Sequence, residues 1–542
     1  MKTELRFDSR RSPVYATRGM VATSQPLAAQ AGIEILSQGG SAADAAVATA
    51  AVLNVTEPTS TGIGGDCFLL YYQASSKSVL AYNGSGRSPA GLTLDRLAME
   101  GFSDGIPRYH AHTITVPGAC DGWCSLIESH GRLPLADVFG PAIRLAEQGF
   151  PVSPITAEFW QSGVERQLSR SPGGRELMID GRAPRAGELF RNPGLARTLR
   201  AVADGGSAAF YQGEVGRAIA QVVQHAGGVL SESDLGEHHG EWVDPISTTY
   251  RGFNVWQAPP NSQGLAVLLA LNLLEGFPLA ELQPLGPARL HLILESLRLA
   301  FADTGWHVAD PEFAPAPLPE LLSMGYAAAR RARIDPSRAT LGQPVGQLTT
   351  AADTVYLTVA DSQGNACSLI NSNYTGFGTG IVPAGWGFTL QNRGLGFSLD
   401  PDHPNALAPR KRPYHTIIPG MVTRSDGSLF SSFGVMGGFM QPQGQVQVLI
   451  GLIDDNLDPQ ATLDRPRVCL SAGTPDSPVA LEDGIPDESQ AELKAMGHSV
   501  ETVRGRARAL FGRGQIILRD PDSGVLCGGS DPRADGCALP WV

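Results

Sequence analysis

ADTVYLTVAD, residues 352–361, is the stretch of this 542-residue chain that decides how the rest is interpreted. A polar, alanine-rich segment ends here, and the β-branched and aromatic residues from Thr354 onward predict a strand. A cut between Asp353 and Thr354 would give Thr354 a free α-amino group beside its own hydroxyl. Such an amine has a pKa of about 7.7 to 8.0, so it is a usable base near neutrality. Nucleophile and base would then lie on one residue. The simpler interpretation is a threonine that only packs within a strand.

Composition and charge limit the class of protein. The chain is 42% hydrophobic and 17% charged, and its 64 glycines and 40 prolines indicate many tight turns. A net charge of −12 without a basic stripe argues against a nucleic-acid partner. No apolar run is long enough for a transmembrane helix, and the charged segment 1–11 is unlike a secretory signal. We therefore expect a cytoplasmic protein without a membrane partner.

Metal and cofactor motifs are missing from the sequence. The 7 cysteines are scattered and odd in number, which is unlike a disulfide framework. The closest pair, Cys120 and Cys124, has no second pair or histidine cluster nearby, and His238, His239 and His307 have no partners at ligand spacing. The phosphate-loop, Gly-x-Ser-x-Gly and His-Glu-x-x-His motifs are absent. We expect neither a metal nor a cofactor.

The order of expected elements predicts an α/β sandwich whose two halves share one core. Ser24 with Pro26, and later Ser41, are expected to begin the first two helices. The segment 334–353 lacks periodicity and is expected to be an exposed linker. The expected strands are 19–23, 67–72, 354–360, 366–371, 428–434 and 514–518, and the expected helices are 27–36, 42–53, 441–453 and 488–496, with helical patterns over 135–226 and 264–301.

Several motifs occur together in one order. They are GGSAADAAVA from Gly39, EPTSTGIGGD from Glu57, the strand from Thr354, NSNYTGFGTGIV over 371–382, KRPYHTIIPGM over 411–421 and GVMGGFMQPQ over 434–443. Together they resemble the γ-glutamyltransferase family of N-terminal-nucleophile hydrolases, from about Ala16 to the last strands. The resemblance implies a four-layer αββα sandwich. It also implies processing into a mostly helical large subunit, 1–353, and a β-rich small subunit, 354–542, that share one core.

The resemblance also implies the catalytic residues. Thr354 occupies the position of the nucleophile, and Ser372 keeps a hydroxyl where the family has a threonine that hydrogen-bonds it and assists cleavage. Gly437 and Gly438 match the glycine pair whose backbone N–H groups hold the oxyanion. The alternative for this pair is an ordinary β-turn.

The departures from the family pattern concern the substrate. Where glutathione-cleaving members have an arginine for the glutamyl α-carboxylate, this chain has Ser85, with Arg87 two residues further on. A serine pair that helps to hold that carboxylate becomes His415-Thr416. The three groups that hold the α-amino group become Tyr374, Arg393 and Gly396.

These replacements exchange a carboxylate for a guanidinium. A substrate ammonium would meet a like charge at Arg393, whereas a substrate carboxylate could accept two parallel hydrogen bonds from it. Arg87, His415, Thr416 and Tyr374 are the other candidates for substrate binding. Two alternatives stay open: Arg393 forms a structural salt bridge near Asp400 or Asp402, or Arg87 anchors the turn 83–89.

The resulting hypothesis is a self-processing amide hydrolase with a small-molecule substrate. Its acyl group would carry a carboxylate and no α-amino group, as in oxamate or a glutaryl amide. The alternatives are a glutathione hydrolase or γ-glutamyl transpeptidase, and an inactive relative retained as a binding protein. The sequence leaves open the leaving group, the balance of hydrolysis and transfer, and the oligomeric state, for which a homodimer of the processed pair is one option.

Overall fold

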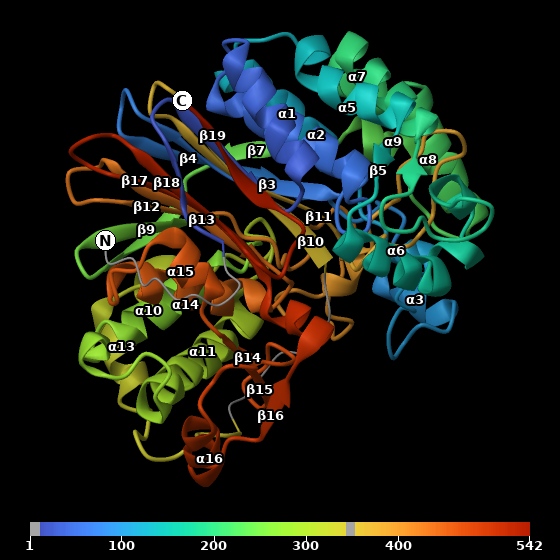
Figure 1. Ribbon diagram of the computed structural model, residues 1–542. Coiled ribbons are helices and arrows are strands. Elements are labelled where there is room, and N and C mark those ends of the chain that lie inside the picture. Colours follow the sequence, from blue (N-terminus) through green and yellow to red (C-terminus); the bar gives the residue numbers. More distant parts are fainter. Residues whose placement is uncertain (1–10, 343–352) are drawn as a thin grey trace.

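Two seven-stranded antiparallel sheets lie face to face between layers of helices in the computed structural model, which describes residues 11–342 and 353–542 (Figure 1). We call them the β10 sheet and the β13 sheet. In spatial order the β10 sheet contains β19 (Cys537–Trp541), β2 (Gly19–Thr23), β10 (Asp353–Ala360), β11 (Ala366–Tyr374), β3 (Asp66–Gln73), β4 (Ser78–Gly84) and β7 (Glu241–Val243). The β13 sheet contains β1 (Val14–Ala16), β18 (Leu526–Ser530), β17 (Arg513–Arg519), β13 (Leu429–Met436), β12 (Gly420–Thr423), β9 (Phe253–Gln257) and β8 (Ile246–Tyr250).

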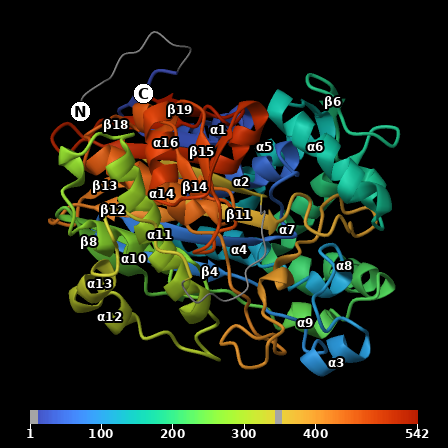
Figure 2. The same ribbon diagram turned by 90° about the horizontal axis from the view of Figure 1, so that it is seen from below.

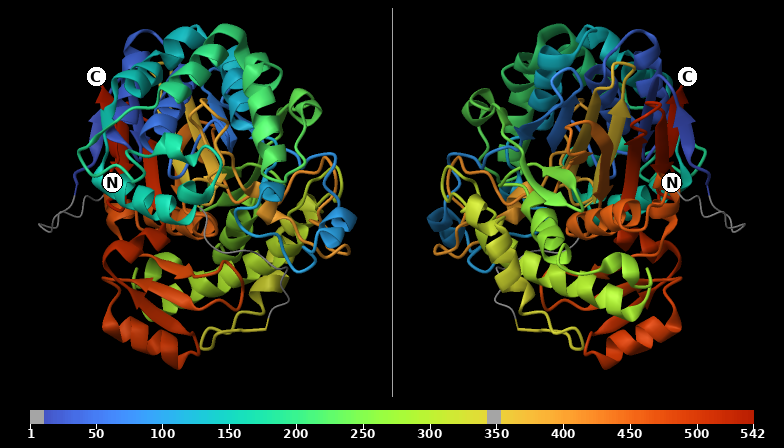
Figure 3. Two further views of the ribbon diagram at one scale, coloured as in Figure 1. Left: turned by 90° about the vertical axis from the view of Figure 1, so that its right-hand side faces the viewer. Right: turned by 90° about the vertical axis from the view of Figure 1, so that its left-hand side faces the viewer.

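Helices cover the outer face of each sheet, so the layers run helix, sheet, sheet, helix (Figures 1 and 3). The β10 sheet is covered by α1 (Pro26–Ser37), α2 (Ala42–Thr56) and α4 (Ala119–His130), with α5 (Leu135–Gln148), α7 (Pro193–Tyr211) and α8 (Glu214–His225) outside them. The β13 sheet is covered by α10 (Gly264–Leu274), α14 (Met440–Ile453) and α15 (Pro459–Asp464), with α11 (Pro287–His307) and α13 (Met324–Arg331) beside them (Figure 2). The predicted four-layer αββα sandwich is confirmed.

Shorter elements complete the chain. A three-stranded sheet contains β14 (Val468–Leu470), β15 (Val479–Glu482) and β16 (Val500–Val503), and a two-stranded one contains β5 (Phe150–Pro151) and β6 (Leu189–Phe190). The other α-helices are α3 (Leu94–Met99), α6 (Pro154–Arg166), α9 (Glu232–Gly236), α12 (Leu318–Leu321) and α16 (Asp487–Ala495). None of the helices in the described part of the chain is both long and apolar enough to cross a membrane.

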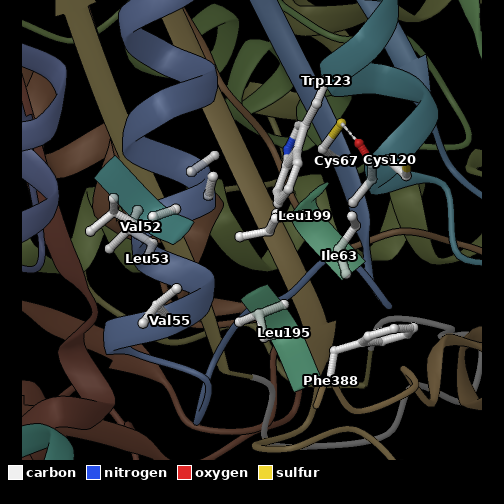
Figure 4. Close-up of a cluster of buried hydrophobic side chains, with 14 of the residues drawn as sticks. Val52, Leu53, Val55, Ile63, Cys67, Cys120, Trp123, Leu195, Leu199 and Phe388 are labelled. Carbon is white, nitrogen blue, oxygen red and sulfur yellow. Dashed lines mark hydrogen bonds between the residues drawn. The ribbon is translucent and has the colours of Figure 1, made fainter. Parts of the chain in front are cut away.

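Alanine-rich α2 explains how the helices approach the β10 sheet so closely. Ser41 begins this helix with a reciprocal capping box to Asp44, as predicted for Ser41, and all of its residues are buried. Small side chains let α2 pack on β10 and β11 on one side and α5 on the other. Beyond it, Trp123 lies among buried apolar side chains (Figure 4). Its Nε1 donates to Asn371 Oδ1 at 3.1 Å, which ties this core to the end of β11.

One detail of the sequence prediction is wrong, and two others are refined. The N-cap of α1 is Gln25, and the Ser24 hydroxyl donates to Glu57 instead. The pattern over 264–301 is two helices, α10 and α11, and the region 135–226 is interrupted by β5, β6 and short 3-10 helices. Of the predicted linker, 334–342 contains no helix or strand, and 343–352 lies outside the described residues.

Candidate active site

Thr354 lies at the start of β10, between β2 and β11, and is fully buried. The β10–β11 ladder shifts register between Asp353 and Val355, so Thr354 is at a β-bulge. Its Oγ1 donates to Ser372 Oγ at 3.1 Å. Asp353 and Thr354 are consecutive residues of β10. The predicted hydrogen bond between the two hydroxyls is present.

Arg393 binds the same serine from a short 3-10 helix, η5 (Arg393–Gly396). Its Nη2 donates to Ser372 Oγ at 3.3 Å and its Nη1 to Thr416 Oγ1 at 2.9 Å. Burial lowers the pKa of Arg393 to about 10, against the opposing effects of Tyr374 and Asp66, so the guanidinium stays protonated at neutral pH. Among the described residues it forms no ion pair, with Asp400 or Asp402 or any other carboxylate, and its Nε–H has no hydrogen-bond acceptor. A buried cation with a spare donor is thus part of the Thr354 network.

The ring of Tyr374 packs against the guanidinium of Arg393. Its ring centroid is 4.2 Å from the guanidinium carbon, a distance that allows a cation–π interaction. The backbone of Tyr374 has φ +77°, which is unusual for a residue with a side chain and costs roughly 1–3 kcal/mol. Its amide donates to Ser372 Oγ at 2.9 Å, so the turn that carries this strain also fixes the serine.

His415 is paired with Asp66, a carboxylate that the sequence prediction did not assign. His415 Nε2 donates to Asp66 Oδ2 at 3.0 Å, and both side chains are fully buried. Burial and the nearby Arg393 lower the pKa of His415 to about 3 despite the favourable Asp66, so the ring is neutral. Burial alone would raise the pKa of Asp66, but His415, Arg393 and Gln391 together lower it. Asp66 is therefore ionised, and it is the negative charge that acts on Arg393.

The signal for Asp66 in the sequence was weak. Its Oδ1 accepts from the amides of Gly86 and Gly118, each at 3.0 Å, and from Gln391. These partners are far apart in the chain. Asp66 does end the Gly-Gly-Asp run of a motif that was singled out, and that was the only pointer available.

The glycine pair forms the turn between β13 and α14. Gly437 has φ +130° and Gly438 has φ +59°, conformations that strongly favour glycine, so the pair is a turn in any interpretation. Gln263, which the sequence prediction also missed, donates from Nε2 to Thr416 O at 2.6 Å and to Gly438 O at 3.0 Å. One amide side chain thus connects the glycine turn to the loop residue Thr416, whose hydroxyl accepts from Arg393.

The packing of the two sheets brings that turn toward Thr354. On one face of β10, Thr358 Oγ1 donates to Ser432 Oγ at 2.6 Å, and the ring of Tyr356 lies against Gly434 of β13. Alternate residues of a strand share a face. Thr354 is the next residue on this face of β10. Two residues beyond Gly434 on β13 is Met436, which directly precedes the glycine pair.

Two other predicted positions have different surroundings. Arg87 directs its guanidinium to Asp310 at 3.3 Å and Glu312 at 2.9 Å, so it holds two loops together, as the anchoring alternative expects. No described contact joins it to Thr354, and its role in substrate binding stays a prediction. At Gly396 a Cβ atom would lie 2.5 Å from Tyr414 O, so this backbone cannot carry the family's aspartate without moving.

One buried group of metal-ligand residues lies away from this site. His291, Glu295 and His498 have ligand atoms within 4.8 Å of one another. Their hydrogen bonds, however, are mutually consistent without an ion: Arg298 donates to His498, His498 to His291, and His291 Nε2 to Asp335 O at 2.8 Å. This order uses each ring nitrogen once, as donor or acceptor. The group is therefore explained as a structural network.

Comparison with known proteins identifies the family. The gamma-glutamyltranspeptidase family profile matches residues 28–541, nearly the whole chain. The chain belongs to this family. It is 39% identical over 529 residues to the glutathione hydrolase-like YwrD proenzyme of Bacillus subtilis, covering 97% of this chain and 99% of that one. It is 34% identical to the oxamate amidohydrolase proenzyme of Klebsiella pneumoniae, covering 96% of this chain and 98% of that one.

The family's solved structures agree with the fold. The cephalosporin acylase from Bacillus halodurans superimposes with a TM-score of 0.92 at 44% identity, covering 100% of this chain and 99% of that one. The prediction of an N-terminal-nucleophile-type amidohydrolase is confirmed at the level of the family. Both curated relatives are named as proenzymes, which implies two subunits from one precursor.

Proposed function

We propose that this chain is the precursor of a self-cleaving amide hydrolase whose nucleophile is Thr354. Its acyl substrate carries a carboxylate and no α-amino group, as in oxamate or a glutaryl amide. The observation that carries the proposal is Arg393: a buried, protonated guanidinium beside the nucleophile, without a carboxylate partner among the described residues. A buried charge is costly unless it is paired, and a substrate carboxylate would supply the partner.

The geometry at Arg393 fits a carboxylate. Nη1 donates one hydrogen to Thr416, and Nη2 donates one to Ser372. The Nε–H has no acceptor, and it lies on an edge of the guanidinium that can donate two parallel hydrogen bonds to a carboxylate. A substrate ammonium in this place would be repelled by a like charge at low effective dielectric. This is the reason for preferring a des-amino acyl group.

Thr354 performs two successive reactions in this proposal. In the precursor its Oγ attacks the carbonyl carbon of Asp353, the peptide C–N bond breaks as the ester forms, and water hydrolyses the ester. The freed α-amine then accepts the Oγ proton when Thr354 attacks a substrate amide. Ser372 holds the hydroxyl in place in both reactions.

The glycine turn and water complete the cycle. Backbone N–H groups of Gly437 and Gly438 stabilise the tetrahedral oxyanion, and each such donor is worth about 2.7–4 kcal/mol. The α-amine returns its proton to the leaving amine, and an acyl ester remains on Thr354. Water then attacks this ester and releases the dicarboxylic product.

A second candidate is a glutathione hydrolase, favoured by the name of the relative that is 39% identical. The deciding experiment compares glutathione with its des-amino analogue, and γ-glutamyl with glutaryl anilide, on purified cleaved enzyme, with oxamate alongside. We expect the des-amino substrates and oxamate to be hydrolysed faster. A preference of more than about tenfold, or 1.4 kcal/mol, for the amine-bearing substrates would reject our proposal in favour of the glutathione enzyme.

Thr354→Ala serves as the control for the nucleophile. We expect it to remain a single chain of 57.1 kDa on denaturing electrophoresis and to hydrolyse nothing. Two fragments from this variant would show that the scissile bond lies elsewhere.

A further inference from the structure

Asp66 lies at the start of β3, separated from the Thr354 strand by β11. In the β3–β11 ladder its partner is Ser372, whose hydroxyl accepts hydrogen bonds from Thr354 and Arg393. The Asp66 side chain is fully buried, and none of the hydrogen bonds described for it reaches Thr354 or Arg393 itself. Its influence on the site is therefore exerted through neighbouring residues and through its charge.

The carboxylate of Asp66 is saturated with donors. Oδ1 accepts from the amides of Gly86 and Gly118 and from Gln391 Nε2, each at 3.0 Å, and Oδ2 accepts from His415 Nε2 at 3.0 Å. An ionised carboxylate offers about four acceptor sites. All of them are used, so Asp66 has no site left for a substrate ammonium.

Gln391 links Asp66 to the segment that carries Arg393. It lies two residues before Arg393, and its amide N–H donates to Gly64 O at 3.0 Å. A Cβ atom on Gly64 would lie 2.2 Å from Thr389 O, so this segment packs directly on the turn that precedes Asp66. The side chain of Gln391 then adds its bond to the carboxylate. The backbone of Arg393 is thus held against the Asp66 turn.

His415 provides the second link. It directly precedes Thr416, whose Oγ1 accepts from Arg393 Nη1 at 2.9 Å. The His415 ring packs edge-on against Phe68, with the ring centroids 4.9 Å apart, and Phe68 shares a face of β3 with Asp66. Asp66 therefore fixes the ring that adjoins one of the two acceptors of the guanidinium.

The charges of Asp66 and Arg393 offset each other without a direct ion pair. Burial lowers the pKa of Arg393, and Tyr374 and Asp66 raise it; burial raises the pKa of Asp66, and His415 and Arg393 lower it. A carboxylate in direct contact would use the donors of the guanidinium. Here the negative charge is held by other donors, so the Nε–H of Arg393 remains available to a substrate.

We propose that Asp66 is a positioning residue that holds Arg393 in the orientation that binds the acyl carboxylate. It acts through Gln391 and His415 on the position of the guanidinium, and it supplies a counter-charge that leaves the Nε–H to the substrate. This rests on the proposed function, in which Arg393 is the ligand of that carboxylate. Asp66 itself touches no substrate atom.

Asp66→Asn tests the proposal. It keeps the shape of the side chain, removes the charge, and can place an N–H group opposite the N–H of His415. We expect KM for glutaryl anilide to rise about tenfold, the effect of one charged hydrogen bond. We expect kcat to stay within about twofold, because the backbone ladder to Ser372 is retained and binding is lost equally in the ground and transition states.

A double-mutant cycle with Arg393→Gln shows whether Asp66 acts through Arg393. If it does, Asp66→Asn should change kcat/KM by less than about twofold in the Arg393→Gln background, because the group that it positions is already gone. A purely structural role would give the same loss in both backgrounds. That result, an unchanged KM in Asp66→Asn alone, or a loss confined to kcat would overturn the inference.

Asp44→Asn is the matched control. Asp44 is also fully buried, and its carboxylate accepts from the amides of Ser41, Arg132 and Leu133 at the start of α2. We expect this variant to unfold at a lower temperature and to keep the KM of the wild type. A rise in KM equal to that of Asp66→Asn would overturn the inference, since it would show a general response to a lost buried carboxylate.

Gln391→Met decides if Asp66→Asn does not fold. It breaks one of the two links and leaves the carboxylate in place. We expect KM to rise about threefold, as for a lost neutral donor, and not to rise further in the Arg393→Gln background. An unchanged KM, or the same rise in both backgrounds, would reject the role of Asp66.

Calorimetric titration with glutarate separates the two proposals, because it needs no turnover. We expect glutarate to bind Asp66→Asn about tenfold more weakly than the wild type, and Arg393→Gln equally with and without Asp66→Asn. If the wild type cleaves no glutaryl amide, the proposed function fails, and this titration still decides the role of Asp66. Equal binding by the wild type and Asp66→Asn, or none by the wild type, rejects it.

Discussion

At the scale of single residues, the site is organised around the charge of Arg393. The guanidinium binds Ser372 and Thr416 and packs on the ring of Tyr374. The ionised Asp66, which is hydrogen-bonded to neutral His415, acts on it electrostatically. The guanidinium holds Ser372, which binds the Thr354 hydroxyl, and in our proposal it also binds the carboxylate of the acyl group. Removing it should affect specificity more than an ordinary structural arginine would.

We expect Arg393→Gln to lower kcat/KM for glutaryl amides about 100-fold, since charged hydrogen bonds contribute about 1.5–3 kcal/mol each. The preference for glutaryl over γ-glutamyl amides should shrink, because the charge that repels an ammonium is gone. Steady-state kinetics on both anilides measure this. Arg87→Gln is the companion variant; its guanidinium already pairs with Asp310 and Glu312, so we expect a smaller loss. An equal loss in the two variants, with specificity unchanged, would contradict the role of Arg393.

Sequence alone pointed to the hydrogen-bonded residues around Thr354 but not to the residues that support them. Thr354 and Ser372 lie in the ordered motifs, Arg393 was assigned from the family pattern, and the structure brings the three into one set of hydrogen bonds. Asp66 and Gln263 were missed because their partners are fixed by sheet register and by a loop crossing. A buried carboxylate or amide has no local pattern that distinguishes it from a turn residue.

At the scale of elements, the contact between β10 and β13 sets the position of Thr354. Gly434 lies directly against β10: a Cβ atom there would lie 2.5 Å from the Tyr356 ring. Tyr356 is two residues from Thr354 on the same face of β10, so we expect a shift at this point to move Thr354. Glycine is required here by the approach of the neighbouring sheet.

Gly434→Ala should therefore slow self-cleavage and destabilise the fold by about 1–3 kcal/mol, the usual cost of overpacking a core. Thermal unfolding and the time course of the two fragments on denaturing gels measure these effects. Gly91→Ala is the control, because a Cβ atom there would have no described neighbour closer than 3.7 Å. Normal cleavage and stability in Gly434→Ala would show that the sheets separate without cost.

Element boundaries were predictable where a helix has a distinct signal. Ser41 and the alanines after it identified α2. The break between α10 and α11 was missed because both helices are largely buried, so neither shows the polar face that marks a boundary by periodicity. The start of α1 was misplaced by one residue because Ser24 hydrogen-bonds Glu57 rather than the helix backbone.

At the scale of the whole molecule, buried neutral histidines connect distant segments. His498 follows α16 and hydrogen-bonds His291 of α11 at 2.8 Å, while His415 joins the β10 sheet through Asp66. Burial, with Arg298 and His291 nearby, lowers the pKa of His498 to about 3, a value like that of His415. The unfolded chain would titrate both rings at about 6.5.

Stability should consequently fall on acidification. Between about pH 6.5 and 3 these two histidines are protonated in the unfolded chain but not in the folded protein. Each one therefore lowers the free energy of unfolding by up to about 1.4 kcal/mol per pH unit as the pH falls through this range. Above about pH 6.5 their contribution to stability is fully present. We expect the Tm of the wild type to be lower at pH 5 than at pH 7.5, measured by circular dichroism at fixed ionic strength.

His498→Gln should have a lower Tm than the wild type at pH 7.5, because His291 and Arg298 lose a hydrogen-bond partner. Its Tm should, however, decrease less than that of the wild type between pH 7.5 and pH 5. His225→Gln, at an exposed position of α8, should keep the pH response of the wild type. If the Tm decreases by the same amount in His498→Gln and in the wild type between the two pH values, the buried histidine network does not cause the acid sensitivity of the fold.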